Sequence, residues 1–261
     1  MSLPRGVTPG ALDLLDEGLE RVSRAWGAVG AFWILALPAR VALVDLVLLA
    51  TGPDRRFAPL LERSYLVLAL GLLTVYGRVA LGRALAARPP APPDRWRILA
   101  VPPAAFARAM TATLAVLLAS MLLGFTVLAP LVLLPLLGLV AVAPGERVLT
   151  LLSGPLRLLG LHLLLLPGLL VVAVNLYGVI SLVATAVSSV LPGDPQRLAR
   201  TLVLENPRYL ALLIAGMTLC IEPVWLGALT AHVEAARART SGEDLRVWLE
   251  ELRARAPRRA A

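Results

Sequence analysis

The 261-residue chain is poor in charge and in the residue types that build most reactive sites. It has no lysine, two histidines and one cysteine, and only 16% of its residues are charged. A single cysteine excludes a disulfide framework and a thiolate metal site. The sequence also has no zinc-binding His-Glu-x-x-His pattern, no glycine-rich phosphate loop and no Gly-x-Ser-x-Gly nucleophile motif. We therefore expect no catalytic residue, no cofactor and no metal.

What the chain does contain is apolar. Hydrophobic residues make up 58% of it, and its mean hydropathy is +0.79. Soluble domains contain roughly 45–50% apolar and about 25% charged residues, and a chain of this size could not bury the excess. The composition predicts an all-α polytopic membrane protein with the lipid bilayer as its surroundings. Although the pI is about 11.0, we expect no nucleic-acid partner, because the arginines fall between apolar runs, where they orient membrane spans.

Apolar runs long enough to approach the ~20 residues of a membrane helix predict about six spans within the segment 27–230. The stretch 109–143 carries no charge and is too long for one crossing, while Pro130 and Pro135 offer breaks. A full fourth span, a re-entrant segment and one kinked helix all remain open there. The predicted spans are 27–50, 64–85, 109–128, 130–143, 158–187 and 209–230.

Both ends of the chain carry the pattern of an amphipathic helix at the membrane surface. In the segment 1–26, apolar residues recur at spacings of three and four, and Trp26 is predicted to anchor the helix at headgroup level. Acidic residues near the start disfavour a cleaved signal peptide, so we expect an uncleaved N-terminus. In the segment 231–261, an apolar stripe that includes Trp248 as a second anchor is followed by a basic tail. The first stripe consists of Leu12, Leu15, Leu19, Val22 and Trp26.

The arginine distribution predicts the orientation. With six spans and both termini on one side, seventeen arginines lie on that side and six on the other. Basic residues are enriched in cytoplasmic loops. The count therefore places both termini in the cytoplasm, in the inner membrane of a bacterium.

Two charges deep in predicted spans form a candidate polar cluster. Arg40 lies thirteen residues into the span 27–50, and Glu222 lies in the span 209–230. An unpaired charge at mid-membrane costs about 2.5–3.5 kcal/mol, so we expect the two to meet. Pro38 and Pro223 free the carbonyls of two residues one turn earlier, and Arg40 is expected to bond one of them. The pair is either a static clamp between helices or a functional site.

Four other residues complete the predicted sites. Asn175, in the span 158–187, is added to the polar cluster because amides hydrogen-bond helices to one another in lipid. Arg78 is expected to anchor the inner end of its span by extending its guanidinium to the surface. Trp26 and Trp248 are the other two interfacial anchors.

Two stretches resemble one family. The opening LPRGVTPGALDLLDEGLERVSRAW, the Leu37-Pro38 step and the late HVEAARARTSGEDLRVWLEEL resemble the bacterial membrane-domain family named after glycerophosphoryl diester phosphodiesterases. The resemblance implies a polytopic helical topology with an amphipathic leading helix. It implies no activity for this chain.

These observations favour a non-catalytic accessory or assembly subunit whose cytoplasmic helices dock protein partners. The alternative is a small permease or channel subunit with a polar path through Arg40, Glu222 and Asn175. A membrane-embedded enzyme that acts on lipid ranks third, because no nucleophile or metal set is present.

Overall fold

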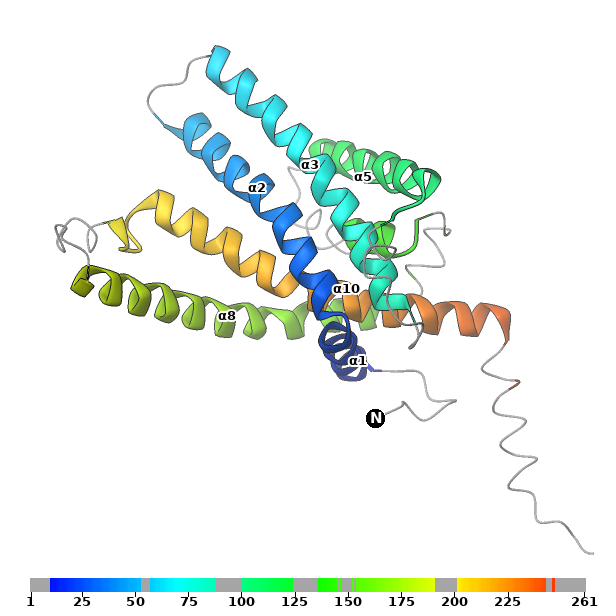
Figure 1. Cartoon of the computed structure of the whole chain (residues 1–261). Helices are drawn as coiled ribbons and strands as arrows, with labels where there is room; N and C mark the ends of the chain where they lie inside the picture. The colour runs from blue at the N-terminus through cyan, green and yellow to red at the C-terminus, as the bar shows by residue number, and fades with distance from the viewer. Residues whose placement is uncertain are drawn as a thin grey trace, which may run out of the picture.

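The computed structural model of the chain describes residues 10–52, 57–87, 100–123, 136–144, 154–190 and 201–242, together with positions 146, 152 and 246. Its regular structure over these ranges is helical, as the composition predicts (Figure 1). A short helix covers 136–142. The longer helices are α1 (Ala11–Arg24), α2 (Trp26–Thr51), α3 (Phe57–Ala86), α5 (Pro103–Leu123), α8 (Pro155–Val190) and α10 (Pro207–Ser241).

Within the described ranges, four helices, α2, α3, α8 and α10, are long and apolar enough to cross a membrane. They have 26 to 36 residues, and about 20 residues span the ~30 Å hydrocarbon core. Each contains one of the predicted spans, 27–50, 64–85, 158–187 or 209–230, and extends beyond it. The extra length of α8 and α10 requires tilt or ends that project from the bilayer.

The two remaining predicted spans are described only in part. The span 109–128 begins inside α5, and its residues 124–128 lie outside the described ranges. The span 130–143 is described from residue 136, where the short helix 136–142 begins. The count of six spans therefore stays a prediction.

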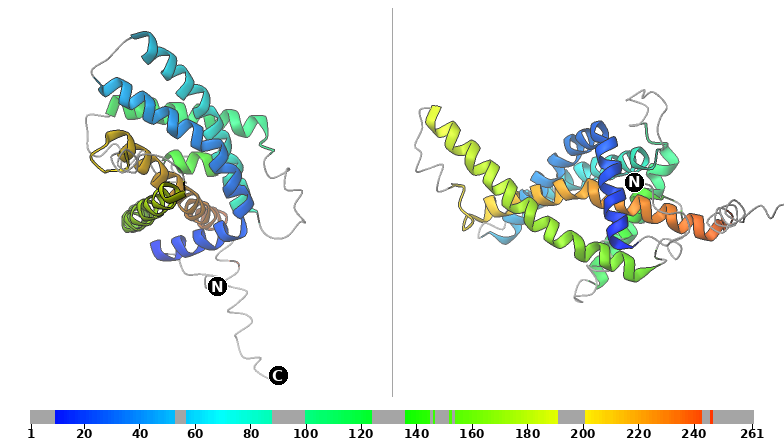
Figure 2. Two further views of the ribbon diagram at one scale, coloured as in Figure 1. Left: turned by 60° about the vertical axis from the view of Figure 1, so that its left-hand side comes forward. Right: turned by 90° about the horizontal axis from the view of Figure 1, so that it is seen from below.

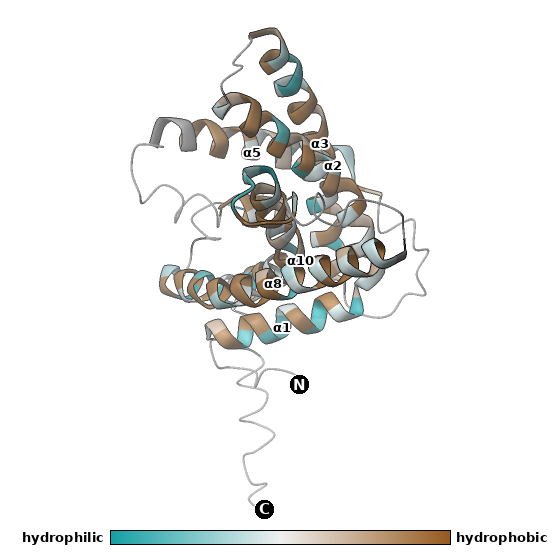
Figure 3. Ribbon diagram, turned by 90° about the vertical axis from the view of Figure 1, so that its left-hand side faces the viewer, coloured by the Kyte–Doolittle hydropathy of each residue, from teal (hydrophilic) through white to brown (hydrophobic). Residues whose placement is uncertain are grey.

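The long helices form two antiparallel pairs. In the first pair, Gly77 of α3 faces Phe32 and Leu35 of α2, and the absence of a side chain there lets the helices approach. In the second pair, α8 packs along α10, which also contacts α2 and α3 (Figures 1 and 2). Brown, apolar residues make up most of these helices in Figure 3, and many of their large apolar side chains are exposed. This distribution suits helices whose surroundings are lipid rather than water.

Helix α1 crosses the C-terminal half of α10, which continues beyond the crossing (Figure 2). The α1 residues buried there are Leu14, Gly18 and Val22. The predicted stripe differs from this face: it shares Val22, but Leu12 and Trp26 are more than half exposed. The difference arises because the packed face is centred on Gly18, which permits close helix contact. A search for regularly spaced large apolar residues does not detect a glycine. Because part of the stripe is exposed, α1 could still lie at the membrane interface through Leu12 and Trp26. That position stays a prediction.

At the other end of the chain, α10 continues without a break through Ser241. The start of the segment 231–261 is therefore part of the last long helix. Gly242 ends α10 in the left-handed conformation, with φ of +69°, which is the usual glycine stop of a helix. The predicted second amphipathic helix and its Trp248 lie outside the described residues.

Candidate functional site

The centre of the candidate site is one buried carboxylate shared by two arginines. Glu222 of α10 is only 3% exposed. Its Oε2 accepts a hydrogen bond from Arg40 Nη2 of α2 at 2.6 Å, and its Oε1 accepts from Arg78 Nε of α3. The consecutive helices α2 and α3 are therefore tied at one point to α10, which lies far from them in sequence. We call these three residues the Arg–Glu–Arg cluster.

The structure brings Arg40 and Glu222 together, as the sequence argument expects, and adds a third member. Arg78 differs from its prediction as an interfacial anchor, because its guanidinium turns inward to Glu222 instead of extending to the surface. The physical reason is that a buried carboxylate offers a charge-assisted hydrogen bond inside the bundle. The position of Arg78 along its predicted span placed it near the inner surface. The sequence did not show which neighbouring helix its side chain would contact.

Pro223, the proline next to Glu222, frees a backbone carbonyl within α10. Pro223 lacks an N–H, so it leaves the carbonyl of Leu219 without its partner in the helix. Trp33 Nε1 of α2 donates to this carbonyl at 3.1 Å. The expectation that Arg40 bonds a freed carbonyl is thus wrong for Leu219. The sequence did contain a signal for this contact. Trp33 and Arg40 lie two helical turns apart on one face of α2, so both can face α10.

The cluster carries a net charge of about +1, since two guanidinium groups share one carboxylate. Arg40 Nε is buried and has no hydrogen-bond partner among the described residues. Such an N–H is costly to leave unpaired in a region without water. The arrangement can hold three helices together and can bind an anion.

Asn175 does not join this cluster. It lies near the middle of α8, is exposed, and donates from Nδ2 to the carbonyl of Val171 in its own helix at 2.8 Å. The polar path through Arg40, Glu222 and Asn175 is therefore not assembled in the described part of the chain. The reason is that α8 meets α10 through other faces, as where Gly168 approaches Ile221.

Trp26 is the predicted anchor that the structure leaves on the surface. It is 60% exposed, and its ring meets Trp33 edge to face with centroids 5.4 Å apart. The role of Trp26 as an interfacial anchor stays a prediction.

A second charged cluster, which the sequence argument missed, fixes α1. Arg21 donates from both terminal nitrogens to the carboxylate of Glu234 at 2.9 Å and from Nε to Glu17. It also donates to the carbonyl of Leu85 at 3.2 Å, near the end of α3. Burial lowers the pKa of Arg21, but hydrogen bonds and charges from Glu234 and Glu17 outweigh it and raise that pKa. Arg21 therefore stays charged and joins α1, α3 and α10.

His162 connects α8 to α10. Its Nε2 lies 3.1 Å from Trp225 Nε1, and its Nδ1 lies 2.6 Å from the carbonyl of Leu158. An indole N–H can only donate, so Nε2 accepts and Nδ1 carries the proton. The ring thus joins two helices as a neutral imidazole.

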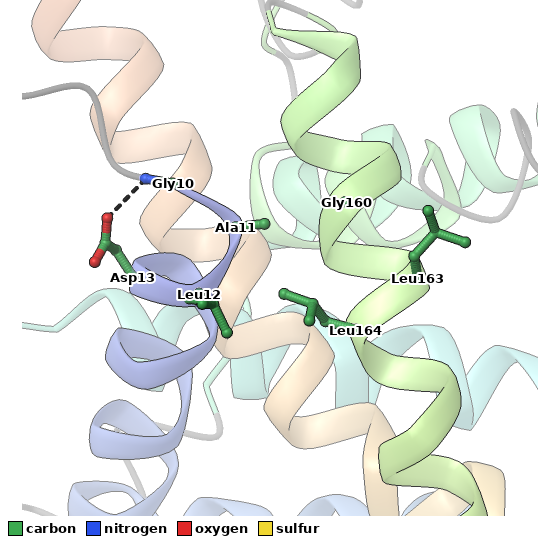
Figure 4. A pocket seen from close by; sticks show the side chains of 7 residues that line it. All are labelled: Gly10, Ala11, Leu12, Asp13, Gly160, Leu163 and Leu164. Atoms are coloured by element: carbon green, nitrogen blue, oxygen red, sulfur yellow. Dashed lines mark hydrogen bonds between the residues drawn. The ribbon is translucent and has the colours of Figure 1, made fainter.

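A wide hollow of about 600 Å³ lies between the first turn of α1 and α8. Figure 4 shows its seven lining residues, of which Asp13 alone is charged. The Asp13 carboxylate accepts the backbone N–H of Gly10 at 2.7 Å and so closes the first turn of α1. This hollow offers a ligand little polar chemistry.

Comparison with family models, with curated proteins and with solved structures gives no match. The resemblance to the membrane-domain family therefore stays an expectation.

Proposed function

We propose that the chain is a non-catalytic accessory or assembly subunit of a protein complex in the bacterial cytoplasmic membrane, with both termini in the cytoplasm. The Arg–Glu–Arg cluster acts in it as a clamp that holds α2, α3 and α10 together. The partners expected at the cytoplasmic face would contact the exposed stripe of α1. The observation that carries the proposal is the exposed amide of Asn175 on α8.

Helix α8 is the least covered of the candidate spans: only 6% of its most apolar window is buried. Exposure to lipid is favourable for aliphatic side chains, but it is unfavourable for an amide, whose polar groups find no hydrogen-bond partner there. A carboxamide offers two donors and two acceptor lone pairs, and Asn175 uses one N–H within α8. Polar groups within spans almost always face protein or a water-filled cavity. We infer that a helix of another protein covers this face of α8.

The permease alternative has weaker support. It needs polar groups in a continuous line, and Asn175 is exposed and hydrogen-bonds within its own helix instead of joining the other two members of the path. A shared carboxylate between two arginines also favours a fixed connection. Moving the carboxylate would leave both guanidinium groups unpaired, and moving either arginine would leave that arginine's own charge unpaired in the membrane.

Site-specific photo-crosslinking in native membranes tests the proposal. A photoreactive amino acid replaces Leu182, which lies two turns from Asn175 and is 72% exposed, and in a control replaces Ile34 of α2, which is 74% exposed. We expect position 182, but not position 34, to give an adduct with one other membrane protein in a fixed ratio. Asn175→Leu should abolish that adduct while the chain remains in the membrane.

Two results would overturn the proposal. One is crosslinking to lipid alone at both positions. The other is an adduct between two copies of this chain, which would make α8 a self-association surface.

A further inference from the structure

A pocket of about 300 Å³ lies between α2, α3 and α5, and both arginines of the Arg–Glu–Arg cluster line it. Ligand pockets begin at about this size and combine apolar walls with a few polar groups. Thr74 and Thr113 add two hydroxyl side chains, and aliphatic residues form most of the remaining wall. The pocket therefore has a cationic, hydrogen-bonding part and an apolar part.

The charge that faces the pocket is positive. Glu222 is not among the lining residues, because it lies on α10 beyond the two arginines. A group in the pocket would thus meet guanidinium and hydroxyl groups but no carboxylate of the described chain. The cluster's surplus positive charge and the unpartnered Nε of Arg40 are both what a bound anion would neutralise.

The apolar part of the pocket opens outward. Leu68 of α3 and Leu117 of α5 line it and are 56% and 47% exposed. Gly71 also lines it, and a Cβ placed there would meet nothing within 4 Å. At the depth of the cluster, the surroundings of α3 are the acyl chains of the bilayer. A lipid tail can therefore enter sideways without crossing water.

We propose that this pocket binds a single-chain amphiphile with an anionic head. The carboxylate or phosphate of the head accepts hydrogen bonds from Arg40 and Arg78, and the acyl chain lies along the aliphatic wall past Gly71. Guanidinium groups suit both heads, since they bind planar carboxylates and phosphates through paired N–H donors. This inference does not depend on a partner helix at α8.

The test uses the full chain in nanodiscs of phosphatidylcholine and a palmitic acid analogue that carries a photoreactive diazirine. Labelling is mapped to peptides by mass spectrometry. We expect labels on α3 and α5 beside the pocket. Unlabelled oleate or lysophosphatidate should compete, whereas zwitterionic lysophosphatidylcholine should not. Stronger competition by oleate identifies a preference for a carboxylate head, and stronger competition by lysophosphatidate identifies a preference for a phosphate head.

Gly71→Leu supplies the decisive variant, because it fills the pocket and leaves the Arg–Glu–Arg cluster intact. A Cβ at Gly30 of α2 also meets nothing within 4 Å, so Gly30→Leu is the matched control outside the pocket. We expect Gly71→Leu to lower the labelling about tenfold through steric exclusion, and Gly30→Leu to leave it unchanged. Equal labelling of the two variants, or equal competition by lysophosphatidylcholine, would overturn the proposal.

Discussion

Over the residues that the structure describes, Glu222 is the only counter-charge of both arginines in the Arg–Glu–Arg cluster. Replacing either arginine leaves one neutral ion pair, whereas replacing the glutamate leaves two guanidinium groups without a counter-charge. Breaking a buried pair by removing one partner costs about 3–5 kcal/mol, because an uncompensated charge stays behind. The shared carboxylate therefore predicts an unequal response to mutation within the cluster.

We expect Glu222→Leu to lower the free energy of unfolding by about 3 kcal/mol or more. Arg40→Leu should lower it by less. The reason is that Arg78 still neutralises Glu222 when Arg40 is lost. The double variant Arg40→Leu with Glu222→Leu should remain destabilised, because Arg78 is then unpaired. Thermal unfolding in a mild detergent measures all three.

The triple variant, with leucine at Arg40, Arg78 and Glu222, is the control. It should recover most of the stability that Glu222→Leu loses, since leucine is favourable at the centre of a span. Equal destabilisation by Glu222→Leu and Arg40→Leu would contradict the shared carboxylate.

At the scale of the elements, the attachment of α1 to α10 depends on missing side chains. A Cβ at Gly18 would lie 2.7 Å from the backbone nitrogen of Ala228, and one at Gly227 would lie 2.7 Å from the carbonyl oxygen of Gly18. Neither atom can move without shifting a helix. The two glycines therefore set how closely α1 and α10 cross, and the ion pair of Arg21 with Glu234 forms beside that crossing.

Gly18→Leu should therefore separate α1 from α10. Overpacking a close contact costs about 1–3 kcal/mol, and the shift would also weaken the Arg21 ion pair. We expect trypsin to cleave after Arg21 or Arg24 about tenfold faster in the detergent-solubilised variant. Gly27→Leu is the control, because a Cβ there meets nothing within 4 Å, and its cleavage rate should match that of the unaltered protein. Unchanged protection in Gly18→Leu would show that the crossing tolerates a side chain.

The same helix shows what sequence can predict of an element. Periodicity predicts that the segment forms a helix with an apolar face, and α1 is a helix from Ala11 to Arg24. Which face packs on protein was not predictable, because Gly18 contributes by its lack of a side chain and Leu12 is left exposed. In the candidate site, the positions of Arg40 and Glu222 along their spans were enough to predict that the two lie at a similar depth. The contact of Arg78 with Glu222 was not predictable, because it depends on how α3 packs.

At the scale of the whole molecule, hydrophobic length predicts the long helices well and the region between them poorly. An apolar run with charged residues on both sides marks a span, which is why α2, α8 and α10 contain the predicted ones. The run 109–143 has no internal charge, so sequence gives no point at which one helix ends and the next begins. The breaks placed at Pro130 and Pro135 fall outside the described residues.

The antiparallel pairs bring several chain positions to one end of the bundle. Arg21 of α1 bonds both the carbonyl of Leu85, near the end of α3, and Glu234, near the end of α10. At the opposite end, Arg208 at the start of α10 pairs with Asp45 of α2 at 3.1 Å. The orientation predicted from the arginine count assigns the Arg21 end to the cytoplasm.

Cysteine labelling tests this orientation. In a Cys220→Ala background, single cysteines replace Phe57 at the start of α3, Ala87 just after its end, and Ser241 at the end of α10; all three positions are exposed. We expect a membrane-impermeant maleimide to label position 57 in intact cells. Positions 87 and 241 should react only after the membrane is opened, because α3 and α10 both end at the Arg21 end of the bundle. The reverse pattern would show that the arginine distribution assigns the wrong side, and different behaviour of positions 87 and 241 would contradict the helix arrangement itself.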